Sequence, residues 1–419
     1  MHRFAHLADV HLGASREPQL RRMELQAFDS AMTACIEAKV DFVLACGDIF
    51  HVGIPDLSVV NSAVRSMMRA QEAGIPIYAI YGSHDYTPNG TSVIDILDTA
   101  GVLTNVFRPE LEGDKMKLGF VTDEKTGAKV AGISARKIGL ESRYYEILDR
   151  AALEAEYGFK VFLFHSGLTE LKSDNLREME TIDVGLLPRG FDYYAGGHIH
   201  ERGEYDLEGH DNIVFPGPLS IGHGADLEAT ARGEKRGIYI VEFDDAVRRK
   251  RFVPVGDFSG VFREFDLTGL NAPEAGARIR EVMQAVDVEG KLVVLKAFGE
   301  LSGGRVSDVG FATVREELSA RGALHVYLSR NSLRSMEVLQ EVAVGQDPAG
   351  IEKALFEKGA GRVKVSFEGL RGEKGPAAAV ELLKLMRQQP KLGEAKRDYV
   401  QRMVDGGRKT LGVEEVPQR

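Results

Sequence analysis

Several features are scarce or missing from this chain of 419 residues, and each absence excludes a class of protein. Only two cysteines occur, Cys35 and Cys46, and both stand among apolar neighbours, so a disulfide framework is not expected. No run approaches the roughly 18 consecutive apolar residues of a membrane span. A candidate metal ligand, Asp9, lies so near the start that it leaves no room for a signal peptide. These absences predict a cytoplasmic protein without a membrane segment.

The chain also lacks an excess of positive charge, since its formal net charge is -10. A protein that coats nucleic acid through bulk electrostatics would be basic. A local basic groove remains compatible with this charge, and divalent ions at a carboxylate-lined site would offset negative charge where a phosphate approaches. The net charge therefore argues only against nonspecific coating of nucleic acid.

Short apolar runs alternate with amphipathic stretches up to about residue 245, which is typical of βα units. The pattern predicts helices over 21–39, 57–73, 92–100 and 144–157, and strands over 42–45, 77–81 and 161–164. After residue 200 the short strands and turns indicate that the sheet is completed by antiparallel strands.

The length predicts two or three domains. We expect a first domain over residues 1–250, a small α/β domain over 256–332, and a mainly helical tail over 335–419. The small domain contains no candidate metal ligand except the isolated His325, so we expect it to shape or cover a site. The tail is either a surface helix pair that packs on its own domain or a helix-loop-helix that binds a partner.

Five apolar runs of the first domain end on aspartate or histidine. The clusters are Asp9 with His11, Gly47-Asp48, Gly82-Ser83-His84-Asp85, His165, and Gly197-His198-Ile199-His200. Because ligands of α/β sheets bind beyond the carboxyl ends of the strands, we expect the clusters to meet at one rim. Imidazole and carboxylate ligands suit zinc, manganese or iron, and the absence of cysteine argues against structural zinc. The ligands suffice for two ions that share one carboxylate, the arrangement of a dinuclear hydrolase.

In this order the clusters resemble the motifs of the calcineurin-like metallophosphoesterases: D-x-H, G-D, G-N-H-D or G-N-H-E, a lone H, and G-H-x-H. More narrowly, His-Leu-Ala-Asp-Val-His-Leu-Gly at 6–13 and Gly-Asp-Ile-Phe-His at 47–51 resemble SbcD-type (Mre-family) nucleases of DNA double-strand-break repair. The resemblance implies a β-sandwich flanked by helices, a small α/β capping domain and a helical C-terminal tail. The motifs cover residues 1 to about 245, whereas the cap and tail fit by layout alone.

The resemblance also implies roles for single residues. The first ion would be held by Asp9, His11, Asp48 and His200, and the second by Asp48, Ser83, His165 and His198. His84 would contact the scissile phosphate and help protonate the leaving oxygen, Asp85 would orient the ring of His84, and His51 would handle DNA. Ser83 departs from the family pattern, which has asparagine there. Ser83 could coordinate directly, a water could fill the gap, or the second ion could bind more weakly. Of these outcomes we expect a weakened or water-completed second site and a requirement for higher manganese.

The leading hypothesis is a manganese-dependent exonuclease and endonuclease that hydrolyses phosphodiester bonds at DNA ends. The chain has no G-x-x-x-x-G-K-[ST] loop, so an ATP-driven step would need a partner. By resemblance, that partner is an SbcC-type coiled-coil ATPase that docks on the helical tail, and the nuclease forms a homodimer. The alternatives are a small-substrate phosphatase or cyclic-nucleotide phosphodiesterase, and a non-catalytic scaffold with a decayed metal site.

The remaining histidines have simpler interpretations. His6, inside the first apolar run, is expected to be a core residue with its hydrogen bonds satisfied. His2, His210 and His325 have no carboxylate or histidine at useful spacing and are expected at the surface. His223 lies in a glycine-rich loop that could approach DNA phosphates.

Overall fold

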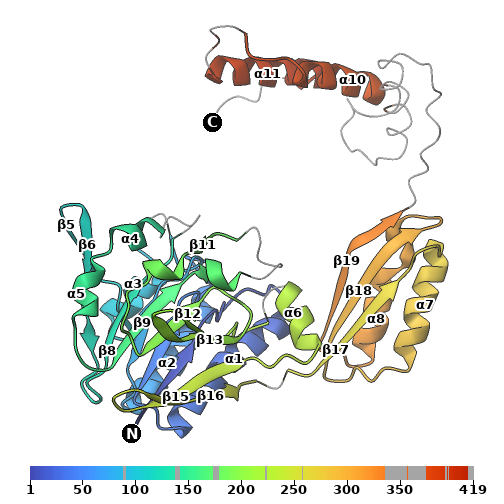
Figure 1. Cartoon of the computed structure of the whole chain (residues 1–419). Coiled ribbons are helices and arrows are strands. Elements are labelled where there is room, and N and C mark those ends of the chain that lie inside the picture. Colours follow the sequence, from blue (N-terminus) through green and yellow to red (C-terminus); the bar gives the residue numbers. More distant parts are fainter. Residues whose placement is uncertain are drawn as a thin grey trace. The chain divides into compact units, whose positions relative to one another are not determined.

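The computed structural model describes residues 1–87, 91–136, 142–172, 179–221, 224–256, 258–335, 356, 374–391, 394 and 396–413. The chain divides into two compact units, Met1–Met336 and Glu337–Arg419 (Figure 1). Among the described residues, no helix combines the length and the apolar character that a membrane crossing requires. Both cysteines are buried free thiols.

The first unit contains a six-stranded sheet with the strand order β16-β15-β1-β2-β3-β4. The first four strands along the chain run parallel: β1 (His2–Leu7), β2 (Phe42–Cys46), β3 (Ile77–Ile80) and β4 (Thr104–Asn105). The antiparallel strands β15 (Gly237–Phe243) and β16 (Val247–Pro254) extend the other edge. Parallel strands therefore carry the first three motif clusters to one edge of this sheet.

A second six-stranded sheet has the order β13-β14-β12-β9-β8-β7. Its strands are β7 (Val121–Thr122), β8 (Lys129–Ile133), β9 (Lys160–His165), β12 (Tyr193–Gly197), β13 (Gly203–Leu207) and β14 (His210–Phe215). Strand β12 runs parallel to β9, with Gly197 opposite His165, so these two clusters end side by side. Two short pairs lie outside this sheet: β5 (Pro109–Glu112) with β6 (Lys115–Leu118), and β10 (Gly167–Leu168) with β11 (Thr181–Ile182).

The two sheets pack face to face on an aromatic core. Phe4, Phe42, Leu163 and Tyr193 are fully buried in this layer, and the rings of Phe4 and Phe42 stack with 5.2 Å between their centroids. The outer face of the first sheet is covered by α1 (Pro18–Glu37), α2 (Leu57–Glu72) and α3 (Val93–Thr99). The predicted β-sandwich flanked by helices is confirmed.

The helix predicted over 144–157 is wrong in one respect, because it is two helices, α4 (Ser142–Ile147) and α5 (Arg150–Glu154). The break occurs where Leu148 forms a β-bridge with Met116 and the N–H of Asp149 donates to the Met116 carbonyl at 2.8 Å. Leu148 is buried in the core beneath the second sheet. A backbone pairing formed by a distant strand thus overrides local helical periodicity.

Residues 260–335 form a parallel three-stranded sheet with the order β17-β18-β19. The elements are β17 (Gly260–Asp266), α7 (Ala272–Gln284), β18 (Leu292–Leu301), α8 (Phe311–Ala320) and β19 (His325–Ser335). Apolar side chains of α7 and α8 pack on one face of the sheet. Leu292 and Val294 belong to a second cluster with Leu227 and Ala231 of α6 (Gly224–Ala231). The whole segment belongs to the first compact unit, and the domain boundary expected near residue 250 stays a prediction.

The described part of the second unit contains α10 (Lys374–Met386) and α11 (Lys396–Leu411). A Cβ at Gly406 would lie 2.8 Å from Leu385 Cδ1, so glycine lets the two helices approach closely. The guanidinium of Arg402 donates to Glu394 at 2.8 and 2.9 Å and to Gln388 Oε1 at 2.7 Å. These contacts hold the two helices as a hairpin.

Two histidines outside the motif clusters lie in the interior. His6 is fully buried, with Nδ1 3.0 Å from Tyr193 Oη and Nε2 3.2 Å from the Gly196 carbonyl. A carbonyl only accepts, so His6 Nε2–H donates to it, and a neutral ring accepts from tyrosine at Nδ1. His210 was expected at the surface, and this prediction is wrong: its ring is fully buried and contacts the carbonyls of Leu187 and Glu208.

The burial of His6 predicts a pH-dependent stability. Burial lowers the pKa of His6 from 6.5 to about 3, so below pH 6.5 the unfolded chain takes up a proton that the folded chain does not. The free energy of unfolding should therefore fall by about 2 kcal/mol between pH 7.5 and 5 through this group. Urea unfolding in the presence of a chelator, compared with His6→Gln, isolates this contribution. An equal pH dependence in both proteins would contradict it.

Candidate metal centre

Backbone hydrogen bonds connect the loops that follow strands β1 and β2 of the first sheet. The N–H of Asp9 donates to the Gly47 carbonyl at 3.1 Å, and the N–H of His11 donates to the Asp48 carbonyl at 2.8 Å. The carboxylate of Asp9 in turn accepts the N–H of His198 at 3.0 Å from the end of the second sheet. The loops that carry the clusters therefore hold one another in place.

Four of the expected ligands have a left-handed backbone. The φ angles are 51° at Asp9, 48° at His11, 52° at Asp48 and 81° at His198. Only six non-glycine residues in the described ranges have a positive φ, so these four form the majority. Such conformations cost energy and gather at functional sites, where the surrounding structure enforces them. No sequence signal marks them, because aspartate and histidine here replace the glycine that a left-handed position normally favours.

Glycines let the clusters come together. A Cβ at Gly82 would overlap the side chain and backbone of Asp48, and one at Gly47 would lie 2.8 Å from the Gly82 backbone. A Cβ at Gly197 would lie 2.6 Å from His165 Nδ1 and overlap the Cys46 carbonyl. These glycines make room for the ligands next to them.

The structure gathers six expected ligands into two groups. The first group is Asp9, His11 and His200, whose ligand atoms all lie within 4.8 Å of one another. His11 Nε2 is 3.2 Å from His200 Nε2, and His200 Nε2 is 3.8 Å from Asp9 Oδ1. Three ligands from two different sheets thus surround one point.

The second group is Asp48, His165 and His198, also within 4.8 Å. Asp48 Oδ2 is 3.2 Å from His165 Nε2 and 3.7 Å from His11 Nε2 of the first group. Asp48 therefore lies where a carboxylate shared between two ions would be needed.

The donor atoms fit metal ions. His165 Nδ1 is 2.7 Å from the Cys46 carbonyl, so this nitrogen carries the proton and Nε2 is left as the lone-pair donor. Nε2 is buried, has no hydrogen-bond partner and faces Asp48 Oδ2. Two lone-pair donors that face each other in the interior need a positive charge between them, and a divalent ion between the imidazole and the carboxylate would supply it.

The charges of the two groups are strongly coupled. Burial by itself would raise the pKa of Asp48, but the imidazoles of His165, His11 and His84 hold it well below its usual value. Against the effect of burial, Asp48 and Asp9 raise the pKa of His165 to about 10. Burial raises the pKa of Asp9 to about 6 despite the nearby imidazoles. Metal ions and protons would bind the same ligand atoms, so the two should compete for these groups.

The calcineurin-like phosphoesterase family matches residues 2–202 of the chain. The chain contains a calcineurin-like phosphoesterase domain. Members of this family use a two-metal site, and the two groups described above are the candidates for it here. The expected enzyme class, a metal-dependent phosphodiesterase, is confirmed.

Similarity to curated proteins supports the resemblance to SbcD-type (Mre-family) nucleases. The DNA double-strand break repair protein Mre11 of Archaeoglobus fulgidus is 26% identical over 360 residues, covering 82% of this chain and 77% of that protein. Mre11 of Sulfurisphaera tokodaii is 29% identical over 243 residues, covering 57% of this chain and 59% of that protein. An uncharacterised metallophosphoesterase of Bacillus subtilis, YhaO, is 26% identical over 230 residues, covering 52% and 53%. The chain therefore spans less than two thirds of two of these three relatives.

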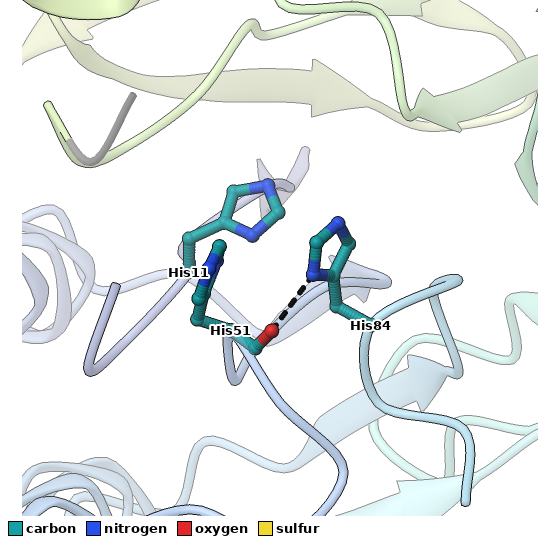
Figure 2. Close-up of side chains that lie close together, drawn as sticks. All are labelled: His11, His51 and His84. Atoms are coloured by element: carbon teal, nitrogen blue, oxygen red, sulfur yellow. Dashed lines mark hydrogen bonds between the residues drawn. The ribbon is translucent and has the colours of Figure 1, made fainter. Parts of the chain in front are cut away.

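Beside the first group of the phosphoesterase domain lie two further histidines (Figure 2). His84 Nδ1 is 2.7 Å from the backbone carbonyl of His51, and the rings of His51 and His84 stack with 4.9 Å between centroids. The ring of His11 packs edge-on against His84, with 4.9 Å between centroids. The three rings place nitrogen atoms within 4.8 Å of one another.

The role expected for Asp85 is corrected. The atom that holds His84 Nδ1 is the His51 carbonyl, whereas the buried Asp85 carboxylate accepts the N–H groups of Ile49, Phe50 and Gly82 at 2.9–3.2 Å. Burial raises the pKa of Asp85 to about 7, and the nearby Asp48 carboxylate adds to the rise. Asp85 thus ties the loop after β2 to the loop after β3.

A cavity of about 640 Å³ opens onto both ligand groups of the phosphoesterase domain. Ser83 and His84 line it together with Asp48, His198 and His200. Ser83 therefore lies at the site, as expected from its place in the motif. His223 lies outside the described residues.

Sequence analysis missed Asp226, which also lines this cavity. Its carboxylate oxygens are 2.9 and 3.1 Å from His200 Nδ1. Burial opposes protonation of His200, but Asp226 and then Asp9 raise its pKa above the ordinary value. Asp226 follows a glycine-rich loop far along the chain, and no motif points to it.

The close approach at Gly82 is testable. In Gly82→Ala the new Cβ would displace Asp48, so we expect Mn²⁺ affinity to fall by at least about tenfold, as when a group that supports a metal ligand is lost. Isothermal titration calorimetry measures the affinity. Gly119→Ala is the matched control, because a Cβ there meets nothing within 4 Å. Equal affinities in the two variants would rule out the constraint.

Proposed function

We propose that this protein is a manganese-dependent DNA exonuclease and endonuclease that hydrolyses phosphodiester bonds at DNA ends in double-strand-break repair. The observation that carries the proposal is the shared cavity, which is lined by residues of both candidate metal groups and by His84, whose ring stacks on that of His51. Two relatives that bear the name of a DNA double-strand break repair protein support DNA as the substrate.

In this proposal Asp9, His11, Asp48 and His200 hold the first ion, and Asp48, Ser83, His165 and His198 hold the second. Two metal ions so bound would supply a nucleophile at neutral pH and offset the negative charge of the phosphate. The protein fixes the ligands beforehand through the hydrogen bonds from Asp9 to His198 N–H and from Asp48 to His84 N–H, the latter at 2.7 Å.

His84 is the proposed proton donor to the leaving oxygen. Its Nδ1–H donates to the His51 carbonyl, which fixes the orientation of the ring and leaves Nε2 as the nitrogen that can donate a proton to the substrate. As the phosphorus–oxygen bond breaks, the Nε2 proton passes to the departing oxygen, and the ring becomes neutral. Histidine suits this role because its unperturbed pKa lies near neutrality.

His51 is the proposed contact to DNA. Its ring stacks on that of His84 and packs at 5.6 Å between centroids against His11, so it borders both the proton donor and the first ligand group. Asp85 does not act on the substrate in this scheme, but fixes the two loops that carry these histidines.

The central test is cleavage of linear duplex and hairpin DNA with Mn²⁺. We expect His84→Ala to lose about 10²–10⁴-fold in rate, because a general acid contributes that much, while Mn²⁺ binding is retained. His2→Ala, which removes a partly exposed histidine at the start of β1, should cleave like the unchanged protein.

Two other results would contradict the proposal and favour an alternative function. Hydrolysis of bis(p-nitrophenyl) phosphate without cleavage of DNA would identify a small-substrate phosphodiesterase. Mn²⁺ binding without hydrolysis of either substrate would identify a scaffold.

The serine at position 83 predicts a weak second site. A hydroxyl is shorter than the amide of the family's asparagine, so we expect Ser83→Asn to lower the half-saturating Mn²⁺ concentration, by about tenfold if the new ligand adds about 1.4 kcal/mol. Metal titration of DNA cleavage measures it, and an unchanged value would refute the weak site. Ser83→Ala separates two cases: a higher requirement means that serine coordinates, and an unchanged one means that water completes the site.

We further propose that the phosphoesterase domains form a homodimer. Apolar side chains are exposed on and before two helices that cover the first sheet: Ile54 (74%), Leu57 (82%) and Met68 (45%) near α2, and Ile96 (59%) on α3. Exposed apolar side chains concentrated on adjoining elements are typical of protein interfaces. This surface supports self-association through α2 and α3.

The α10–α11 hairpin is the proposed docking site for an SbcC-type coiled-coil ATPase. It exposes Met386 (73%), Val400 (49%) and Val404 (43%), and a groove lined by Ala377, Leu385 and Leu411 runs between its helices. So small a unit can bury little core of its own. An apolar partner helix would cover these side chains.

A further inference from the structure

Asp226 lies behind a candidate metal ligand and is almost fully buried, at 4% exposure. Both of its carboxylate oxygens are within 3.1 Å of His200 Nδ1, on the side of the ring opposite to Nε2. Because a carboxylate only accepts, the proton of the neutral ring is held at Nδ1 and the Nε2 lone pair faces Asp9 and His11. A metal-ligating histidine commonly has such a partner on its second nitrogen.

The position of Asp226 is itself fixed. Buried Arg236 donates to the Asp226 carbonyl at 2.8 Å and to Thr230 Oγ1 at 2.9 Å, so it holds two turns of α6. Its guanidinium is 4.0 Å from Asp226 Oδ1 and offsets the buried negative charge.

The opposite side of α6 is anchored in the three-stranded sheet. Leu227 and Ala231 pack with Leu292 and Val294 of β18, and Glu228 lies 3.5 Å from Lys296 on the same strand. A helix held on both sides cannot rotate Asp226 away from His200 without breaking these contacts.

From this arrangement we infer that Asp226 is a positioning residue of the first metal site, which fixes the tautomer and the orientation of His200. The inference rests on the proposed role of His200 as a ligand. The inference also gives α6 a function. The helix connects the metal site, through Asp226 and His200, to the three-stranded sheet, whose strands carry none of the proposed ligands.

The test is a double-mutant cycle in which the affinity for Mn²⁺ is the readout. Electron paramagnetic resonance of free Mn²⁺ measures this affinity in titrations of the full chain. Asp226→Ala should weaken first-site affinity by about 10–100-fold, and Asp226→Asn, which keeps an acceptor, by less. Asp245→Ala removes an exposed carboxylate between β15 and β16 that pairs with Arg248, and should leave the affinity within about twofold.

The His200→Ala background decides between positioning and a general structural role. We expect Asp226→Ala to have no further effect there, since the ring it positions is gone. Equal losses in both backgrounds, or no loss in the single variant, would overturn the inference. If His200→Ala itself leaves Mn²⁺ affinity unchanged, the ligand assignment fails instead, so the two failures are distinguishable.

Discussion

The close approach of five strand ends is the constraint on which the candidate site depends. The ends of β1, β2 and β3 in one sheet meet those of β9 and β12 in the other, and no side chain larger than hydrogen fits at Gly47, Gly82 or Gly197. Each glycine adjoins a ligand or contacts one. Without that clearance the sheets would have to separate, and ligands contributed by both would no longer converge.

The acidic side chains of the site also organise the backbone. Asp9 holds the N–H of His198, Asp48 holds that of His84, and Asp85 holds three N–H groups of two loops. These bonds stabilise left-handed conformations that aspartate and histidine would otherwise avoid. A carboxylate that bonds to backbone and also faces a metal position couples ligand geometry to loop geometry. Preorganisation of this kind places ligands before any ion binds.

Much of this site could be predicted from the sequence, because strand ends and residue chemistry are local properties. The apolar run before each cluster indicates a buried strand, and parallel topology brings the clusters to one edge. Contacts between distant segments could not be predicted. The backbone pairing that breaks a helix at Leu148, the burial of His210, and the approach of Asp226 to His200 each depend on packing between elements far apart in the chain. The motif predicts that Asp85 orients the ring of His84, whereas its contacts with the backbone of two loops depend on the tertiary fold.

Each candidate ligand group draws on both halves of the sandwich. Asp9 and His11 follow β1 in the first sheet while His200 follows β12 in the second, and Asp48 is likewise opposed by His165 and His198. A bound ion would therefore act as a cross-link between the two sheets at the strand ends that carry the ligands. Binding that requires the folded arrangement adds stability in proportion to the logarithm of ion concentration, about 2.7 kcal/mol at a hundredfold excess over the dissociation constant. Ions that serve catalysis would then also stabilise the packing of the two sheets. Metal depletion in the cell would lower the folding stability of the protein as well as its rate of catalysis.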